Sequence, residues 1–369
     1  MLKILILIML VILCLTYYIS QTRKYNKDND YGYHIVNISS KNINKFLVFT
    51  SRSRSIMEIL QTGKSFTTMG EMIITLSAIY GFQNLGYQVI IVTSRYDFQL
   101  HNNNIIGYIL DYKTLEQVKD LVLTKESIEK VTFFCSWGRS DEEMKRRWSN
   151  GKYYLPSYRV LTPYDLGGYT SDGKTIANNT FLGFLPSMLE VQNNKSTEIV
   201  FDKNTIGYWL GKNEYLLFFN NSETIINYVT SKGHNLYVTS DEFKKNIRGI
   251  QNLGLLSRNK FFDLLKHIKY IIGTGQPMHG TSLIEILQEE IFLLAPSPQM
   301  PYGIRNHPNY ICTDNMNHIA IEKFISSVTN GEIKPVRKNI EQYTTENYMK
   351  RLCKIYNISP CTYKWNYLE

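Results

Sequence analysis

Residues 270–294 read Tyr-Ile-Ile-Gly-Thr-Gly-Gln-Pro-Met-His-Gly-Thr-Ser-Leu-Ile-Glu-Ile-Leu-Gln-Glu-Glu-Ile-Phe-Leu-Leu. This stretch predicts an apolar strand, a glycine-rich turn, a helix that begins at Thr281, and a second apolar strand. Backbone N–H groups and the positive end of the helix dipole converge at such a turn, which suits it to binding an anion. A simpler interpretation is that Gly273, Gly275 and Gly280 only mark the turn of an ordinary α/β domain, because short glycine patterns arise often.

The same alternation of strand and helix recurs through most of the chain. Four earlier apolar runs predict buried parallel strands with helical segments between them: 45–50, 88–93, 105–111 and 131–135. A loop-like stretch over 153–180 follows, and strand and helix then alternate again towards residue 270. The pattern predicts an α/β protein with two Rossmann-like domains that face a cleft.

The N-terminus carries an apolar run from Ile4 to Ile19 that only Thr16 interrupts. A run of about 16 residues is near the short end for a membrane-spanning helix. A cleaved signal peptide is the alternative, although small residues are missing before any cleavage point. We expect a signal-anchor transmembrane segment over residues 1–19 and a short polar stem over 20–44.

Two further features favour a body in the lumen of the secretory pathway. Sequons for N-glycosylation begin at Asn37, Asn178, Asn194, Asn220 and Asn357, although an Asn-rich chain produces some of these by chance. After Cys14, the remaining cysteines are Cys135, Cys312, Cys353 and Cys361, an even number that permits two disulfides. Cys353 and Cys361 are close enough in sequence to pair, but four cysteines allow three pairings. The positive-inside rule alone would place the body in the cytoplasm, because basic residues follow the apolar run.

Charge and composition limit the classes of partner. The formal net charge is +9, but lysines and arginines are spread along the chain without an arginine-rich run or an aromatic-basic repeat. This distribution argues against nucleic-acid binding. The absence of a Cys-x-x-Cys pair and of a His-Cys cluster argues against a structural zinc site.

Four sequence blocks, in order, resemble the N-acetylglucosaminyltransferase V family, the α-1,6-mannosylglycoprotein 6-β-N-acetylglucosaminyltransferases. They are Met69-Gly-Glu-Met with a following Leu85-Gly-Tyr, Arg159-Val-Leu, Asn179-Thr-Phe-Leu-Gly-Phe, and Gly254-Leu-Leu-Ser with residues 273–296. The resemblance covers about residues 65–350, most of the body. It implies a GT-B fold, with an acceptor-side domain over 45–185 and a nucleotide-sugar-binding domain over 186–369.

The resemblance also implies a reaction and a location. Members of the family move N-acetylglucosamine from UDP-N-acetylglucosamine, with inversion, to the 6-hydroxyl of a mannose on N-glycans. They do so in the Golgi without a divalent metal, and we expect no cofactor. The expected protein is therefore a single-pass type II Golgi membrane protein with a luminal body, whose partners are the UDP-sugar and a glycoprotein N-glycan.

Glu71 matches the catalytic carboxylate of the family. Inversion in one displacement needs a base that takes the proton from the acceptor hydroxyl, and a carboxylate can serve. The alternative is that Glu71 is an acid at the start of a helix that only complements the dipole.

The donor site is expected around the glycine-rich turn. Its expected donor contacts are Gly273, Gly275, Gly280, Thr281 and Ser282 at the diphosphate, and Glu285 at the ribose hydroxyls. His279 either donates to a phosphate or is simply part of the loop. Glu285 has its own alternative, an acid on the surface of the helix.

The donor block departs from the family pattern. Gly-Gln-Pro-Met-His-Gly stands where the family has Gly-Phe-Pro-Tyr-Glu-Gly, and Ala295-Pro-Ser-Pro replaces its Asn-Pro-Lys-Phe. Two alternatives therefore stay open. One is a catalytically inactive, membrane-anchored glycan-binding or regulatory relative, and the other is a GT-B transferase with another donor such as GDP-fucose.

Overall fold

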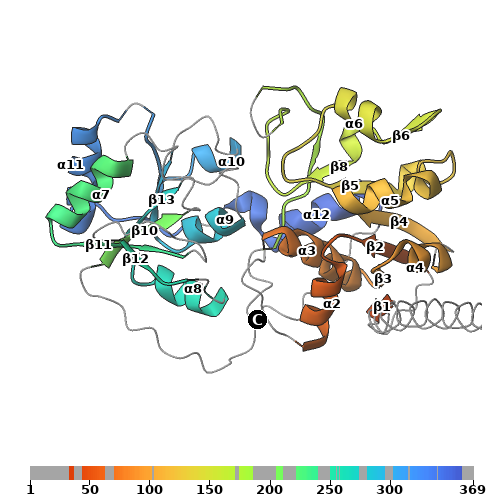
Figure 1. The fold of residues 1–369 in the computed structure, drawn as a ribbon, viewed down its shortest axis with the longest axis horizontal. Helices are drawn as coiled ribbons and strands as arrows, with labels where there is room; N and C mark the ends of the chain where they lie inside the picture. The colour runs from red at the N-terminus through yellow and green to blue at the C-terminus, as the bar shows by residue number, and fades with distance from the viewer. Residues whose placement is uncertain are drawn as a thin grey trace, which may run out of the picture.

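Two separate sheets, parallel except for one edge strand and each covered by helices on both faces, form the computed structural model (Figure 1). The structure describes residues 33–36, 44–62, 70–101, 104–170, 174–185, 205–210, 222–239, 250–254, 256, 258–273, 281–295, 302–314, 316–338 and 340–359. Strands and helices alternate along both halves of the chain. The predicted α/β class with two Rossmann-like domains is confirmed.

The first sheet has seven strands in the order β1-β3-β2-β4-β5-β8-β9. They are β1 (Tyr33–Val36), β2 (Lys45–Phe49), β3 (Gln88–Val92), β4 (Ile105–Leu110), β5 (Val131–Phe134), β8 (Val160–Thr162) and β9 (Thr180–Phe181). All neighbours are parallel except the edge strand β1, which runs antiparallel to β3. The chain passes from β2 to β3 on one side and then crosses to β4 on the other, so the strand order reverses between β2 and β4. A short hairpin, β6 (Ser149–Asn150) with β7 (Tyr153–Tyr154), lies outside this sheet.

Helices cover both faces of the first sheet because its strands are apolar on both sides. In β2, Phe46 and Val48 face one layer of helices, whereas Leu47 and Phe49 face the other. The first layer contains α2 (Ser53–Thr62), α3 (Gly70–Asn84) and α12 (Thr345–Ile355). The second contains α4 (Arg95–Leu100), α5 (Tyr112–Val122) and α6 (Asp141–Arg147). Short 3-10 turns occur at η1 (Ile128–Lys130), η2 (Ser157–Arg159) and η6 (Glu341–Tyr343).

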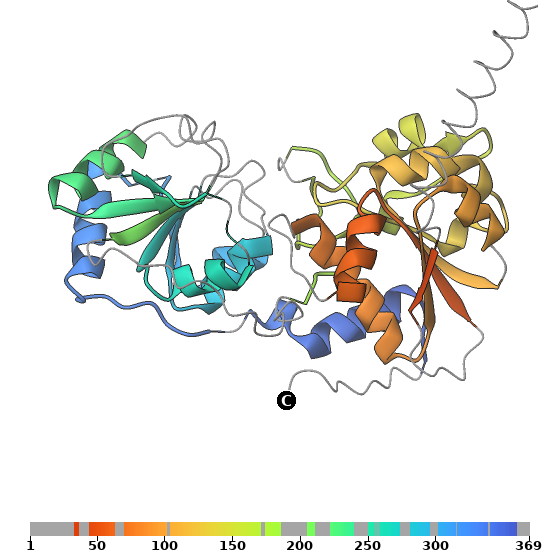
Figure 2. The same cartoon turned by 60° about the horizontal axis from the view of Figure 1, so that its bottom comes forward.

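The second sheet is parallel throughout and has the order β12-β11-β10-β13-β14-β15. Its strands are β10 (Thr205–Leu210), β11 (Asn235–Val238), β12 (Ile250–Asn252), β13 (Tyr270–Gly273), β14 (Phe292–Ala295) and β15 (Tyr310–Cys312). In chain order this is 3-2-1-4-5-6, the order of dinucleotide-binding Rossmann domains. One face carries α7 (Ser222–Ser231) and α11 (His318–Thr329), and the other carries α8 (Arg258–Leu265) and α9 (Thr281–Gln288) (Figure 2). The short α10 (Tyr302–Arg305) precedes β15.

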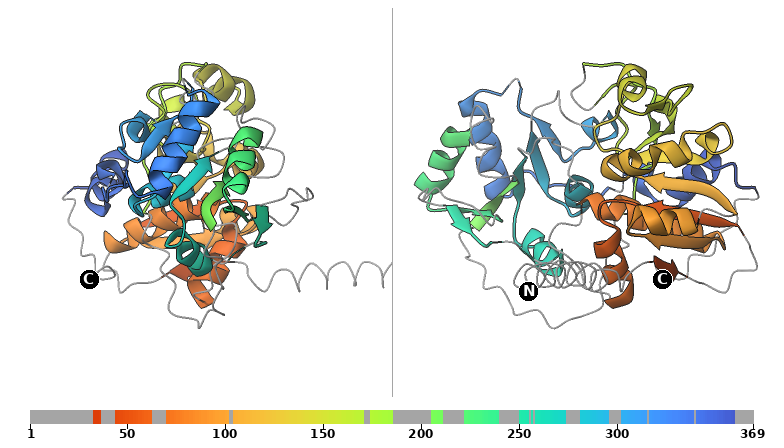
Figure 3. Two further views of the ribbon diagram at one scale, coloured as in Figure 1. Left: turned by 90° about the vertical axis from the view of Figure 1, so that its left-hand side faces the viewer. Right: turned by 45° about the vertical axis from the view of Figure 1, so that its right-hand side comes forward.

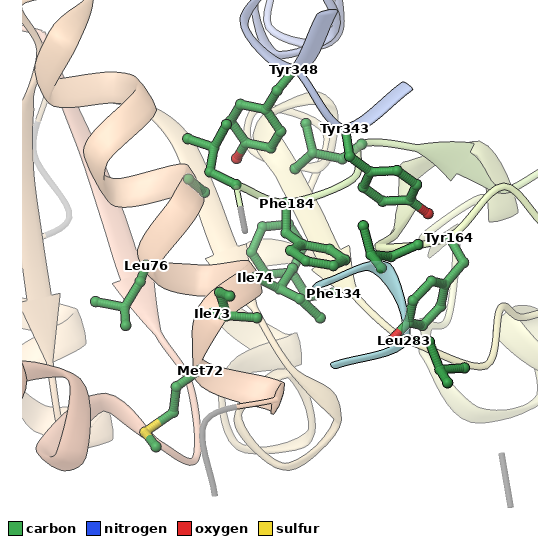
Figure 4. Packing of buried hydrophobic residues seen from close by; sticks show 14 of the residues in the cluster. Met72, Ile73, Ile74, Leu76, Phe134, Tyr164, Phe184, Leu283, Tyr343 and Tyr348 are labelled. Atoms are coloured by element: carbon green, nitrogen blue, oxygen red, sulfur yellow. The ribbon is translucent and has the colours of Figure 1, made fainter. Parts of the chain in front are cut away.

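One hydrophobic cluster runs through both domains. It joins α3 and the first sheet to α8, α9 and the second sheet. Figure 4 shows Leu283 of α9 beside Tyr164 of the first domain, in the same cluster as Ile73 and Ile74 of α3. Helices α3 and α9 lie side by side where the domains meet. The two domains therefore share a buried apolar contact.

The C-terminal part of the second half returns to the first domain (Figure 3). Arg351 of α12 donates from Nε to the carbonyl of Leu182 at 2.8 Å, and its guanidinium lies 4.4 Å from the centre of the Phe181 ring. Tyr356 packs edge-on against Phe46, and its hydroxyl lies 2.6 Å from Thr132 Oγ1. The sequence analysis groups this segment with the second domain, but its contacts are with the first.

The expected anchor over residues 1–19 lies outside the described residues, and residues 33–36 of the expected stem form β1. Among the described helices, none is long and apolar enough to cross a membrane. Cys353 forms a disulfide, whereas Cys135 and Cys312 are free thiols. The expected partner of Cys353 is Cys361, which lies outside the described residues.

Gly107 is required where β4 passes under the Phe46 ring. A Cβ at this position would lie 2.5 Å from Phe46 Cε1 and 2.7 Å from Cδ1. The ring cannot move away easily, because it stacks on Phe82 with 3.5 Å between centroids. We predict that Gly107→Ala lowers the free energy of unfolding by about 1–3 kcal/mol, measured by urea denaturation. In the Phe46→Leu background the same substitution should cost less, and full additivity would contradict this explanation.

His307 predicts a pH dependence of stability. Its Nδ1 accepts from the backbone N–H of Asn309 at 3.2 Å, and its Nε2 lies 3.0 Å from the carbonyl of Lys338, so the neutral ring fits both partners. Burial lowers the pKa of His307, and the charge of Lys338 acts in the same direction. The unfolded chain therefore binds the proton more tightly than the folded protein does. The stability that the neutral His307 ring contributes is present above about pH 6.5 and is lost as the pH falls. His307→Gln should show a shallower fall in unfolding free energy between pH 7 and pH 5. Equal slopes for the two proteins would contradict the assignment.

Candidate functional site

Strand β13, which leads into the glycine-rich stretch singled out in the sequence, lies at the reversal point of the second sheet. The strand order reverses between β10 and β13, and β13 ends at Gly273. Helix α9 is the next described element of the chain and begins at Thr281. In open α/β sheets, ligands bind outside the carboxyl ends of the strands at such a point. The end of β13 therefore lies at the edge of the sheet where open α/β domains bind ligands.

The expected donor residues fall on this segment as follows. Gly273 is the last residue of β13, and Thr281, Ser282 and Glu285 lie in α9. Three of the predicted residues lie outside the described residues: Gly275, His279 and Gly280. Their roles stay predictions.

Glu71, the expected base, lies in the first turn of α3. It stands four residues before Thr75, so the two positions share one face of the helix. Because α3 and α9 lie side by side, the helices that carry Glu71 and Glu285 meet at the domain junction. The catalytic role of Glu71 stays a prediction.

The first domain has a cavity of its own, of about 430 Å³, at the reversal point of its sheet. Thr50, Asp111 and Cys135 come directly after β2, β4 and β5, and all three line it. From α3, Ile74 and Thr75 form another part of the wall. The size lies within the range of small-molecule sites. The sequence analysis missed this site, although polar residues that follow successive parallel strands meet at one edge of a sheet.

Asp111 lines the cavity and accepts hydrogen bonds through both of its carboxylate oxygens. One carboxylate oxygen accepts from both the backbone N–H and the hydroxyl of Ser51, each at 2.6 Å. The other caps α5 by accepting from the backbone N–H of Thr114 at 3.1 Å and from its hydroxyl at 3.0 Å. The hydroxyl of Thr114 also lies 2.5 Å from the carbonyl of Phe49. These contacts tie the ends of β2 and β4 together and occupy both oxygens of the carboxylate.

Cations outnumber acids around the cavity. Arg52, Lys113 and Arg139 line it, against the single carboxylate of Asp111. Arg139 also faces Glu143, with 3.5 Å between Nε and Oε1. The aromatic side chains of Tyr112 and Trp137 line the same cavity, and each is 44% exposed.

The thiol of Cys135 is not suited to nucleophilic attack. Burial raises its pKa, an effect that the nearby charge of Arg139 only partly offsets. Its Sγ lies 3.8 Å from the carbonyl of Gly138. The thiol therefore stays protonated at neutral pH, and the unionised form is a weak nucleophile. Within the described ranges, no group of three or more His, Cys, Asp or Glu side chains could hold a metal ion.

Comparison with known proteins gives distant likenesses only. No family model and no curated protein matches the sequence. The fold resembles the UDP-GlcNAc 2-epimerase of Methanocaldococcus jannaschii, with a TM-score of 0.47 and 11% identity over 85% of this chain and 99% of the other. A glycosyltransferase involved in avilamycin A biosynthesis gives a TM-score of 0.47 and 8% identity, over 85% of this chain and 98% of the other. An alpha-glucosyltransferase in complex with UDP and a 13-mer DNA gives a TM-score of 0.45 and 11% identity, over 87% of this chain and 96% of the other. At these values the likeness assigns this chain neither an activity nor a ligand.

The Asp111 network predicts a measurable contribution to stability. Asp111→Ala removes the cap of α5 and leaves Ser51 without its acceptor, so we expect the free energy of unfolding to fall by about 1–2 kcal/mol. Asp120→Ala, on the same helix, is the matched control, because the pair between Asp120 and Arg95 is exposed to solvent and contributes little. Both would be measured by urea denaturation. A loss no larger than that of the control would contradict the role given to Asp111.

Proposed function

We propose that this protein is an inverting, metal-independent glycosyltransferase of the GT-B type. The second domain binds UDP-N-acetylglucosamine, and the first domain binds the acceptor. The observation that carries the proposal is the packing of α3 on α9, because these helices bear the expected base and the expected donor residues. The 3-2-1-4-5-6 order of the second sheet supports a nucleotide at the start of α9.

In the proposed reaction, Glu71 takes the proton from the acceptor hydroxyl as its oxygen attacks the anomeric carbon. The bond from that carbon to the diphosphate breaks, the configuration inverts, and UDP leaves. Backbone N–H groups between Gly273 and Ser282 and the dipole of α9 stabilise the charge that develops on the diphosphate. Glu285 accepts hydrogen bonds from the ribose, and His279 is a further candidate for a phosphate contact.

The proposed acceptor is a mannose hydroxyl of an N-glycan, and the proposed linkage is β-1,6. We place the protein in the Golgi membrane as a single-pass type II protein with a luminal body. The apolar N-terminal run and the sequons support this placement. So does the disulfide of Cys353, because disulfides persist in oxidising compartments.

A second candidate function rests on the altered donor loop. Residues 275–280 read Gly-Gln-Pro-Met-His-Gly, in place of the loop expected from the family. A relative that has lost its chemistry would still bind glycan through the first domain but would not turn over a donor. A transferase with GDP-fucose as donor would keep the chemistry and bind guanine nucleotides.

The base assignment predicts the outcome of a conservative substitution. Glu71→Gln keeps the shape of the side chain but cannot take a proton, so transfer should fall by about 10²–10⁴-fold. Binding of UDP, measured by calorimetry, should stay within about twofold of the wild type, because the donor contacts lie on the second domain. Glu58→Gln, on the exposed side of α2, is the control for the charge change. Transfer by Glu71→Gln at the control rate would remove Glu71 from the mechanism.

A further inference from the structure

Trp137 is a large aromatic side chain that lies open in the cavity of the first domain. It lines this cavity and is 44% exposed, and no aromatic ring or cation of the described residues stacks on its indole. The other aromatic residue of the cavity, Tyr112, is already engaged, because it packs edge-on against Trp148 and its hydroxyl accepts from Arg147. Tryptophan is highly buried on average, and ligand pockets are typically lined by aromatic side chains. The open indole therefore indicates a ligand that packs on it.

The loop that carries Trp137 is held in one conformation by Asn179. The side chain of Asn179 accepts from the backbone N–H of Arg139 at 2.8 Å, and it donates to the carbonyls of Arg139 at 2.8 Å and Ser157 at 3.0 Å. Gly138 has a φ of 69°, and a Cβ there would lie 2.4 Å from Asn179 Oδ1. An aromatic side chain on a backbone fixed in this way loses little conformational entropy when a ligand binds.

The wall around the indole suits hydroxyl groups and does not require a charged ligand. Ser136 presents a hydroxyl that can donate and accept, and Lys113 presents a donor. Charges of both signs line or flank the cavity, because Asp111 lies in the same wall and Arg139 faces Glu143, with 3.5 Å between Nε and Oε1. Sugar hydroxyls also donate and accept, and a pyranose ring has an apolar face whose C–H groups pack on the negative face of an aromatic ring.

We propose that this cavity is the acceptor site of the transferase and that a neutral pyranose ring stacks on Trp137. The inference rests on the proposed function and adds the residue that recognises the acceptor. A cavity of about 430 Å³ lies within the range that holds drug-sized ligands, which are larger than a hexose. Thr75 of α3 also lines the cavity, four residues after Glu71, so the site lies beside the helix that carries the proposed base.

The test is fluorine NMR of the whole protein labelled with fluorotryptophan. The chain has 4 tryptophans, and the resonance that Trp137→Phe lacks belongs to Trp137. The probes are methyl α-mannoside, the branched mannotriose of the N-glycan core, and glucitol, an open-chain polyol that has no ring face. We expect both mannose ligands to shift the Trp137 resonance in a saturable way and glucitol to leave it unchanged. UDP should not displace the mannotriose, because the proposed donor site lies on the second domain.

Substitutions at Trp137 then measure what the stacking contributes. Trp137→Ala should weaken binding of the mannotriose about tenfold in calorimetry, and Trp137→Tyr, which keeps an aromatic face, should restore most of the loss. In a transfer assay, Trp137→Ala should raise KM for the acceptor by a similar factor, with kcat and UDP affinity within about twofold of the wild type. Tyr96→Ala is the matched control, because Tyr96 is an exposed aromatic residue of α4 that does not line the cavity. Trp137→Ala should unfold close to the wild-type temperature, because the side chain is already exposed, so its lost affinity is not a folding defect.

Several outcomes would overturn the proposal. A Trp137 resonance that neither mannose ligand shifts, or that glucitol shifts equally, would remove the stacking. Displacement of the mannotriose by UDP would assign the cavity to the donor. Transfer with the same acceptor KM in Trp137→Ala as in the Tyr96→Ala control would refute the inference and leave the proposed function intact. Saturable binding of the mannotriose that depends on Trp137, without any transfer, would instead support the site and refute the transferase.

Discussion

The burial of α3 on every side is the constraint on which the rest of the structure depends. Ile73, Ile74, Leu76, Ile79 and Phe82 are all at most 5% exposed, and the helix contacts the first sheet, α12 and α9. The approach to α12 is close at Gly81, where a Cβ would lie 2.5 Å from Leu352 Cδ2. A helix packed in this way fixes how the two domains meet. It also fixes the backbone position of Glu71, which lies in its first turn. Domains joined by an apolar contact also have less freedom to move apart than domains with a polar interface.

The two sheets place their sites by the same rule but in different orders. The first sheet reverses between β2 and β4 and the second between β10 and β13, and a candidate site follows the carboxyl ends of the strands in each. The second order, 3-2-1-4-5-6, is that of dinucleotide-binding domains, and the helix α9 follows the strand at the reversal point. The first site has polar, cationic and aromatic side chains in its wall. Two ligands held by two such edges, with a carboxylate on the helix between them, are what a single-displacement transfer needs.

The sequence analysis was strongest where apolar runs are continuous. The strands around 45–50, 88–93, 105–111, 131–135 and 270 were predicted from their apolar runs, because buried parallel strands leave a clear pattern. Strand β10 was not predicted: Gly207 interrupts its pattern, and it is needed there because a Cβ would lie 2.6 Å from Leu236 and 2.8 Å from Tyr270. The cavity of the first domain was missed because its residues come from distant segments. The return of α12 was missed because short-range pattern carries no information on which domain a helix joins.

The measurement that tests the central claim most directly is a calorimetric titration of the purified protein with UDP, GDP and UDP-N-acetylglucosamine in EDTA. A transferase with the proposed donor site binds both uridine ligands without metal, because backbone N–H groups and the dipole of α9 hold the diphosphate. GDP should bind at least tenfold more weakly. A folded protein that binds none of the three, or GDP alone, would contradict the account. Binding of none of the three would favour a catalytically inactive, glycan-binding relative. Binding of GDP alone would favour a transferase with a guanine-nucleotide donor.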